Sequence, residues 1–471
     1  RELDVVGLDQ VLTFWAPVAP RTVLKGISEL PPAHSLMLEA DGDVRVRRYW
    51  SLDYHPSDRL SEEQSAARLG ELLFDATRIR LRSDVPVGAY LSGGLDSAVV
   101  TTLAKRCTDT PVRTFSITFD DPEFDESPYQ QEVVRVLETE HTAIRCSYEQ
   151  IGRVFPDVVW HAERPILRTA PAPLFLLSGL VREHGYKVVL TGEGSDEVLG
   201  GYDLFKEAKI RRFWAAQPES RLRPLLLRRL YPYLQSLQSQ SQPYLKAFFR
   251  VTPTDCSNAF FSHLPRWELT ARLKLFFSPE VKAQLADYDG YAELRSSLPA
   301  AYSAWDGFSQ AQYLETTSLL PGYILSSQGD RVAMAHAVEG RFPFLDHRLI
   351  EFAAALPARL KMKVLDEKHL LKQSMRDVVP AVVRQRKKQP YRAPDAKSFF
   401  GSPAHPLRHD YVDDMLSPER LRKDGIFNSG AVQKLVDKAR SGSLIGVKDN
   451  MALTGILSTQ LFAQRFLHGS T

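Results

Sequence analysis

The sequence has few cysteines and no long apolar run. Cys107, Cys146 and Cys256 are the three cysteines among 471 residues, and no two of them have the C-x-x-C spacing of a zinc or redox site. This small, odd number predicts free thiols in a reducing compartment. No apolar stretch approaches the roughly 18 residues of a membrane span, and residue 1 does not begin a signal peptide. We therefore expect a cytoplasmic protein with no membrane partner.

The sequence also lacks a large excess of either charge. Lys and Arg number 60 against 57 Asp and Glu, which leaves a net charge of +3. This is too little for a nucleic-acid footprint, which needs a strongly basic surface. Basic runs at residues 221–229 and 384–388 are typical of solvated helix faces. Apolar content of 44% and charged content of 25% are ordinary for a soluble globular protein. The length predicts two or three domains, or one large domain with a satellite.

What the sequence does contain is a glycine turn after an apolar run. Residues 87–91 are typical of a buried parallel strand, and residues 97–103 are typical of a helix. Between them lies Ser92-Gly-Gly-Leu-Asp-Ser97. The two glycines let the backbone approach a ligand closely, and the N–H groups of a turn that opens a helix favour anionic oxygens. The hexapeptide therefore predicts a phosphate cradle that is neither a P-loop nor a GxGxxG turn.

The surrounding pattern alternates strands with helices. Strands are predicted at residues 112–119, 141–146 and 187–191, and helices at 61–79, 127–140, 148–162 and 173–184. Ser61 and Gln64 have the spacing of a capping box. This alternation predicts a doubly wound α/β sheet with parallel strands and right-handed crossovers. A second turn, Gly192-Glu-Gly-Ser-Asp-Glu197, follows the last of these strands, so both turns should lie at the carboxyl edge of the sheet.

The two turns are suited to binding a nucleoside triphosphate. Asp96 and Asp196 could share one or two Mg²⁺ ions that bridge phosphate oxygens, although Ser195 and Asp196 would also serve as helix N-caps. Glu193 lies between two glycines, where packing requires no carboxylate. A carboxylate beside a phosphate site is a candidate general base for an attacking amine. The alternative is a solvated turn residue.

The remaining chain is mostly helical. A helix near residues 5–15 and two strands at 33–39 and 44–50 come first. Residues 234–243, rich in Gln and Ser, are predicted to form a surface loop with no site of its own. Two helices are expected within residues 347–380, and the last helices at about 420–466.

Several charged residues stay ambiguous on chemistry alone. Lys388 lies in a basic, proline-punctuated loop, and either reaches the site to stabilise developing charge or is solvated. Asp330-Arg331 and Arg341 are flanked by apolar residues at expected helix ends, where they form a buried ion pair or contact substrate. His336 is predicted to be a structural histidine.

Five motifs in order carry a family resemblance. Ser92-Gly-Gly-Leu-Asp-Ser97 resembles the pyrophosphate loop of the N-type ATP pyrophosphatases, whose fold is of the adenine nucleotide alpha hydrolase-like type. The synthetase domain of glutamine-dependent asparagine synthetases is similar over about residues 55–400. The motifs that carry this second likeness are Gly192-Glu-Gly-Ser-Asp-Glu197 with Gly200-Gly-Tyr202, Asp330-Arg331, Arg341-Phe-Pro-Phe-Leu-Asp346 and Arg386-Lys-Lys388.

The resemblance implies that ATP activates a carboxylate as an acyl-adenylate and that ammonia then gives an amide, AMP and pyrophosphate. It implies Mg²⁺ on Asp96 and Asp196, Glu193 as the base and Lys388 as the lysine that stabilises the intermediate. It also implies a set of residues that hold the nucleotide and pyrophosphate: Leu91, Ser92, Gly93, Gly94, Asp96, Ser97, Gly192 and Ser195. Arg168, Thr169, Asp330 and Arg341 are the implied candidates for substrate contact.

Residues 1–52 are similar to the end of the family's N-terminal glutaminase domain, and residues 55–471 to its synthetase domain, with a helical insertion at about 203–320. The cysteine that would hydrolyse glutamine has no counterpart in the given sequence, so the chain as given is not expected to use glutamine unless a missing piece or a partner supplies ammonia. Aspartate is the leading acceptor. The alternatives are amidation of a sugar acid or natural-product acid, a lasso-peptide-type macrolactam cyclase, or an inactive binding subunit. A homodimer is a further expectation.

Overall fold

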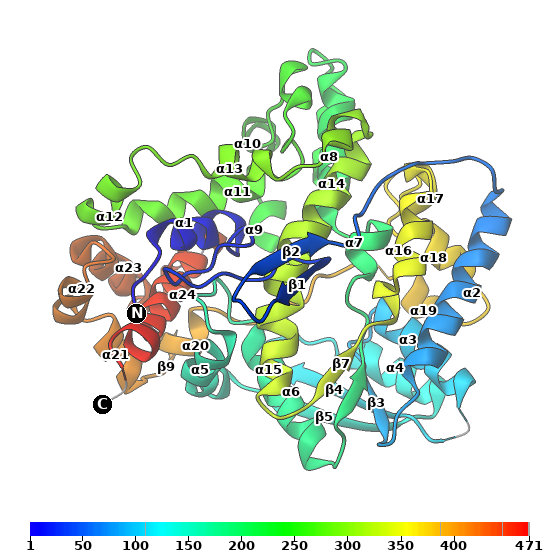
Figure 1. Ribbon diagram of the computed structural model, residues 1–471, viewed down its shortest axis with the longest axis horizontal. Helices are drawn as coiled ribbons and strands as arrows, with labels where there is room; N and C mark the ends of the chain where they lie inside the picture. The colour runs from blue at the N-terminus through cyan, green and yellow to red at the C-terminus, as the bar shows by residue number, and fades with distance from the viewer. Residues whose placement is uncertain (109, 387, 445, 470–471) are drawn as a thin grey trace.

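A five-stranded parallel sheet organises the molecule. The computed structural model describes residues 1–108, 110–386, 388–444 and 446–469. Within that part of the chain the strands lie in the order β5-β4-β3-β6-β7, and all four neighbouring pairs are parallel. Their bounds are β3 (Val87–Tyr90), β4 (Arg113–Phe119), β5 (Glu140–Cys146), β6 (Val188–Leu190) and β7 (Glu339–Arg341). Figure 1 shows the sheet in the lower right of the molecule.

Helices cover both faces of this sheet. Successive strand residues point to opposite faces. Val189 accordingly belongs to the core that contains α5 and α6, whereas its neighbour Leu190 belongs to the core beneath α2 and α3. The helices concerned are α2 (Glu62–Arg80), α3 (Leu95–Cys107), α4 (Ser127–Leu137), α5 (Tyr148–Ala162) and α6 (Pro171–Glu183). The predicted doubly wound α/β fold is confirmed.

The strand order creates a switch point between β3 and β6. From β3 the chain adds β4 and β5 on one side, then returns to pair β6 with the other side of β3. Connections therefore leave β3 and β6 in opposite directions, which opens a crevice beyond their carboxyl ends. The two glycine turns follow these two strands directly, so the topology brings them together.

Helices make up most of the chain after β6, and those from α8 to α14 form the upper part of Figure 1. The next segment contains α7 (Ser195–Leu199), α8 (Asp203–Ala215), η1 (Arg223–Arg229), α9 (Gln235–Gln238), α10 (Gln242–Phe248), η2 (Thr254–Ser257), α11 (Leu264–Ala271), η3 (Arg272–Phe276), α12 (Pro279–Gln284), α13 (Gly290–Ser296), η4 (Ala300–Ala304), α14 (Gly307–Leu314), η5 (Glu315–Ile324), η6 (Ser326–Asp330) and α15 (Arg331–Met334). After β7 come η7 (Pro343–Leu345), α16 (His347–Ala354), α17 (Ala358–Lys361), α18 (His369–Ser374), α19 (Ala381–Arg384), α20 (Lys397–Phe400), α21 (Asp410–Met415), α22 (Pro418–Asp424), α23 (Ser429–Arg440), α24 (Val447–Phe462) and η8 (Ala463–Leu467), with the small hairpin β8 (Gly401–Ser402) and β9 (His405–Pro406) between α20 and α21.

The N-terminal segment packs on this helical region. Helix α1 (Val5–Phe14) ends at Phe14, whose ring lies 4.9 Å from that of Trp267 in α11. Strands β1 (His34–Leu38) and β2 (Val44–Arg48) form an antiparallel hairpin. The hairpin residues are exposed on both faces, so these strands contribute little to the core. Helix α1, rather than the hairpin, attaches this segment.

The local predictions succeed where the sequence pattern is long. Helix α5 has the predicted bounds, and Ser61 and Gln64 form the predicted capping box. Three expectations are wrong. Residues 234–243 contain α9 and the start of α10, because Ser241 caps the latter helix. Arg341 ends a strand rather than a helix. Residues 347–380 form three short helices, α16, α17 and α18, rather than two.

The described residues contain no helix with the combination of length and apolar character that a membrane crossing requires.

Candidate active site

The first glycine turn is closed by its own serines. The Ser92 N–H donates to Ser97 Oγ at 3.1 Å, and the two hydroxyl oxygens lie 3.0 Å apart. Gly93 has a φ of +75°, and a Cβ there would lie 2.8 Å from the Gln130 nitrogen. Only glycine meets both conditions without strain. The turn thus opens α3 with its N–H groups gathered at the carboxyl end of β3.

The second turn contacts the first. A Cβ on Gly192 would lie 2.9 Å from Asp96 Cβ, so the two backbones touch. The Ser195 hydroxyl donates to Asp96 Oδ1 at 2.8 Å. Ser195 is fully buried and therefore acts by holding Asp96 rather than by facing open space. The sequence prediction that both turns meet at one edge of the sheet is confirmed.

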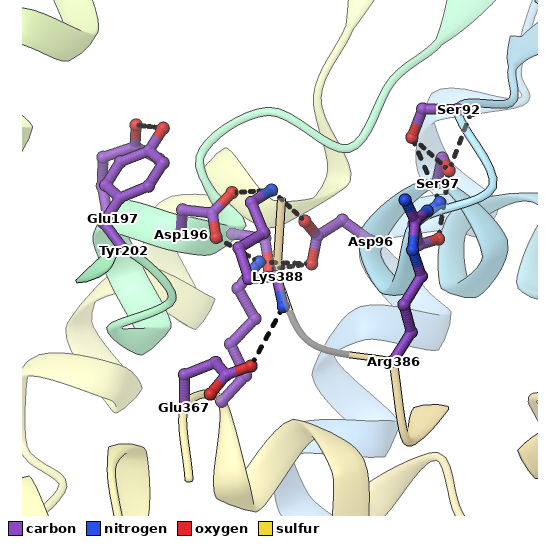
Figure 2. A network of polar contacts seen from close by, with 12 residues as sticks. Ser92, Asp96, Ser97, Asp196, Glu197, Tyr202, Glu367, Arg386 and Lys388 are labelled. Carbon is purple, nitrogen blue, oxygen red and sulfur yellow. Dashed lines mark hydrogen bonds and ion pairs between the residues drawn. The ribbon is translucent and has the colours of Figure 1, made fainter. Parts of the chain in front are cut away.

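Two lysines, Lys368 and Lys388, lie between the aspartates of the turns. Figure 2 labels Lys388 between Asp96 and Asp196. Lys368 Nζ is 2.6 Å from Oδ1 of both Asp96 and Asp196. Lys388 Nζ is 2.6 Å from Asp196 Oδ2 and 3.4 Å from Asp96 Oδ2. Burial alone would raise the pKa of Asp96, but the charges of Lys368 and Lys388 lower it to about 2. Burial opposes the charge on Lys388, and the two aspartates outweigh it and raise the pKa of this lysine.

The paired aspartates fit a divalent cation bound together with phosphate. Mg²⁺ is usually held by one or two carboxylates, with substrate phosphates completing its shell. Asp96 and Asp196 supply two such carboxylates at one point. The described residues contain no group of three or more His, Cys, Asp and Glu side chains placed to hold a metal by themselves. Phosphate oxygens would therefore have to provide the remaining ligands.

Glu193 is half-buried beside these charges and lines the main cavity. Burial raises the pKa of its carboxyl, and the Thr191 hydroxyl, which donates to Glu193 Oε2, opposes that rise. A carboxylate with a raised pKa is a better proton acceptor than a solvated one. The carboxyl group is thus placed to exchange a proton with a bound ligand.

The cavity has a volume of about 420 Å³ and joins both turns to the helical region. Its lining includes Leu91, which follows β3, and Ser116 and Ile117 of β4. The lining also includes Tyr202, Tyr233 and Tyr323. Leu234 also lines it, which corrects the expectation that residues 234–243 have no part in a site.

The loop that carries Lys388 is attached at two points. The Lys388 N–H donates to Glu367 Oε1 at 3.2 Å. Arg386 donates to the Gly93 carbonyl at 3.3 Å and stacks over Tyr129, 3.8 Å from the ring centroid. The Glu367 contact holds the loop to the segment before α18, and the Gly93 contact holds it to the first glycine turn (Figure 2). Lys387, in the same predicted motif, lies outside the described residues.

Of the four candidates for substrate contact, one lines the described cavity and three do not. Arg168 lines the cavity and pairs with Asp395, with Nε 3.0 Å from Oδ2. Thr169 is fully buried and donates to the Pro394 carbonyl at 2.7 Å, which is a structural contact.

Asp330 and Arg341 are not among the residues that line the described cavity. Asp330 is exposed at the start of α15. Arg341 donates to the carbonyls of Arg80 and Arg82 at 2.7 and 2.8 Å. The expected buried ion pair between the two is therefore not formed. His336 accepts or donates a 2.9 Å hydrogen bond with Ser178 and packs on Phe175, as expected of a structural histidine.

Sequence reasoning missed Lys368 and Glu367. Both precede α18, in a stretch that has no glycine turn and no strand before it. Lys368 has a φ of +51°, a left-handed conformation that is uncommon for a side chain of its size. That backbone directs its ammonium to the aspartates. A Lys that follows an acidic residue just before a helix was the available signal, and it is a weak one.

Comparison with known proteins places these features in a family. A family model described as asparagine synthase matches residues 68–464. Amidase chyE of Penicillium rubens is 29% identical over 458 residues, which cover 90% of this chain and 66% of that protein. Glutamine-hydrolyzing asparagine synthetase 1 of Bacillus subtilis is 26% identical over 395 residues, which cover 83% of this chain and 60% of that protein.

This chain thus spans less than two thirds of the length of either relative. Among solved structures, NMN synthetase from Francisella tularensis matches with 19% identity and a TM-score of 0.21, over 30% of this chain and 58% of that one. A likeness that weak carries no argument about this protein. The family model, by contrast, extends over most of the chain and includes both glycine turns, Lys368 and Lys388. The chain belongs to the asparagine synthase family.

Proposed function

We propose that the protein is an ATP-dependent amide ligase. It would adenylate a carboxylate and transfer ammonia to it, giving an amide, AMP and pyrophosphate. The observation that carries this proposal is the meeting of the two glycine turns at the switch point, where Asp96 and Asp196 face Lys368 and Lys388 beside the half-buried Glu193. Family membership supports the same reaction class.

The residues of the chain would divide the work by position. The N–H groups of the first turn, with Ser92 and Ser97, would hold the phosphates at the start of α3. Leu91 and Gly192 line the cavity next to them, where the nucleoside would lie. Mg²⁺, when bound with ATP at Asp96 and Asp196, would screen phosphate charge. Lys388 would stabilise the charge that develops as pyrophosphate departs.

The second half-reaction needs a base. In the first step the acid's carboxylate oxygen bonds to the α-phosphorus and pyrophosphate leaves. In the second, the ammonia nitrogen bonds to the acyl carbon, AMP leaves, and one proton of the nitrogen must be accepted. Glu193 is the carboxylate in place for that proton, since it is half-buried, lines the cavity and has a raised pKa.

We also propose that residues 1–52 are the last part of a glutaminase-type domain and that residues 55–471 form the ligase domain. The exposed hairpin supports this division, because Leu36, Leu38 and Val46 are more than half exposed although they are apolar. Such strands ordinarily need a packed face for stability. Glutamine, delivered through such a domain or a partner, would be the source of ammonia.

The proposed function is tested with purified protein, Mg²⁺-ATP and ammonium, with and without L-aspartate. Aspartate, the usual acceptor in asparagine synthetases, is the first acid to try. Equal amounts of AMP and asparagine, formed only with aspartate, would establish both the reaction and the substrate. AMP formation that depends on another acid would keep the reaction and change the acceptor. The amidase among the relatives gives this second outcome a specific basis. ATP binding without AMP formation for any acid would contradict the proposal.

A further inference from the structure

The cavity has a largely aromatic wall, which we define as Trp15, Tyr202, Tyr233, Leu319, Tyr323 and Tyr391. The wall combines distant segments of the chain. Trp15 follows α1 and lies edge-on to Tyr323 of η5, with 5.4 Å between the ring centroids. Tyr202 follows the second glycine turn and donates to Glu197 Oε1 at 2.7 Å. The wall therefore begins at the reacting groups and continues to the N-terminal segment.

Among the described residues, the four cationic side chains that line the cavity are each paired with a carboxylate of the protein. Arg168 pairs with Asp395 at 3.0 Å, and Arg266 makes two contacts with Glu315. Arg392 pairs with Glu123 at 3.1 Å, and Lys388 with the turn aspartates. Each positive charge is thus offset before a ligand enters.

Carboxyl groups outnumber the cations in the same lining. Seven of them belong to the described cavity: Asp96, Glu126, Glu193, Asp196, Glu197, Asp203 and Glu315. A second anionic group on the substrate would therefore meet no uncompensated cation, so no new ion pair would offset the free-energy cost of removing that group from water. An apolar ring, in contrast, gains from burial against aromatic side chains.

We infer that the acid activated by this protein is a monocarboxylate with an apolar, aromatic body and that the site disfavours a second carboxylate such as that of aspartate. This inference rests on the proposed ligase function and narrows its acceptor. The single carboxylate would lie between Glu193 and Lys388, where the acyl-adenylate forms, and the ring would lie against the aromatic wall. Asp395 would act as a specificity determinant, because it neutralises Arg168 in the cavity lining.

A matched set of acids tests the inference on the unmodified protein. The acids are 3-phenylpropanoate, benzoate, phenylsuccinate and L-aspartate, each with Mg²⁺-ATP and ammonium, and the readout is acid-dependent AMP. Phenylsuccinate has the body of phenylpropanoate and adds one carboxylate. We expect kcat/KM for the better aryl monocarboxylate to exceed those for phenylsuccinate and aspartate by about 10-fold or more, the cost of an unpaired charged group.

Asp395→Asn tests the role of the Arg168 pair. It frees the guanidinium charge and should raise kcat/KM for aspartate relative to phenylpropanoate by about 10-fold. Asp413→Asn is the matched control, because Asp413 pairs with Arg408 and Arg440 at the surface, away from the cavity. It should leave the ratio between the acids unchanged.

The two levels of proposal fail differently. Turnover of aspartate at least as efficient as that of the aryl acids would overturn the inference and leave the ligase function standing. ATP binding, measured as protection against thermal unfolding, without AMP from any of the four acids would overturn both. A ratio between acids that Asp395→Asn and Asp413→Asn change equally would remove Asp395 from specificity.

Discussion

Glu193 shows how one side chain is prepared for proton transfer by its surroundings. Burial raises the pKa of its carboxyl, and the Thr191 hydroxyl limits that rise by donating to the charged form. In the reaction proposed above, the second half-reaction uses that carboxylate, whereas adenylation does not. Glu193→Gln should therefore leave acid-dependent pyrophosphate release near normal and reduce amide formation by about 10²-fold or more. Stopped-flow pyrophosphate release and quantified amide measure the two steps separately, and equal losses in both would contradict the assignment.

The raised pKa of Glu193 also predicts how the rate of amide formation depends on pH. The base must be deprotonated, so amide formation should fall as the pH drops through a pKa above the ordinary glutamate value of 4.5. In Glu193→Gln the residual amide formation should lose this acidic limb, because the titrating group is gone. The measurement is the pH dependence of kcat/KM for ammonia in the native protein and in Glu193→Gln, with the ammonia concentration calculated from the ammonium added at each pH. An unchanged acidic limb in the variant would assign it to another group.

Lys388 touches both aspartates, and in the proposed reaction it stabilises the charge that develops on pyrophosphate. Lys388→Ala should slow adenylation by about 10²-fold or more, as expected when a donor to developing charge is removed. Lys363, which pairs with Glu62 at the surface, provides a matched control as Lys363→Ala. The rate of pyrophosphate release in a single turnover is the measurement. A normal rate in the Lys388 variant would exclude the lysine from the first step.

At the scale of elements, the turn between β3 and α3 depends on one glycine. Gly93→Ala combines a φ of +75° with a Cβ only 2.8 Å from Gln130 nitrogen, so the turn must move. Gly425, with a φ of +68° and no atom within 4 Å of the position a Cβ would take, separates the two effects. Both alanine variants should lose about 1 kcal/mol of stability from backbone strain, and Gly93→Ala should lose more. Only Gly93→Ala should weaken ATP binding, by about 10-fold or more. Calorimetric titration with ATP and thermal unfolding measure these outcomes, and equal ATP affinity in the two variants would contradict the role of the turn.

The elements that the sequence predicts well are those with long or bounded patterns. Helix α5 combines an apolar face with a capping box at Ser147, and its predicted bounds are correct. Strand β7 escapes prediction because it has only three residues, two of them charged, and pairs on one side with β6 alone. Its strand character comes from the neighbour rather than from its own composition. The composition of residues 234–243 favours a loop, although Ser241 and Pro243 are ordinary helix-start residues.

At the scale of the whole molecule, the meeting of the two turns is predictable and most of the cavity is not. Carboxyl ends of parallel strands share one edge of a sheet, so Asp96 and Asp196 can be placed together from local patterns. Lys368 reaches the same point from a distant segment of the chain, far beyond the second turn. Arg266 and Glu315, which pair in the cavity lining, also depend on how the helical region packs. No local pattern specifies these contacts.

The packing of the whole chain also creates a buried lysine outside the site. Lys361 at the end of α17 is 1% exposed, and its Nζ donates to the Ala353 carbonyl at 3.0 Å. It lies 5.5 Å from the Tyr54 ring of the N-terminal segment and 5.8 Å from the Phe308 ring of α14. Three parts of the chain therefore close around one ammonium group, and burial lowers the pKa of Lys361 from 10.5 to about 7.

A lowered lysine pKa makes stability rise with pH. Between about pH 7 and pH 10 the unfolded chain keeps a proton that the folded chain has lost, so deprotonation favours folding across that window. Lys361→Met removes this dependence and keeps the apolar stem. Between pH 7 and pH 9 the free energy of unfolding of the native chain should rise by on the order of 2 kcal/mol more than that of Lys361→Met. Urea unfolding at both pH values measures the difference, with the exposed Lys363→Met as control. Parallel pH profiles for the native chain and Lys361→Met would show that the lysine is charged in the folded protein and that the junction of the three segments admits water.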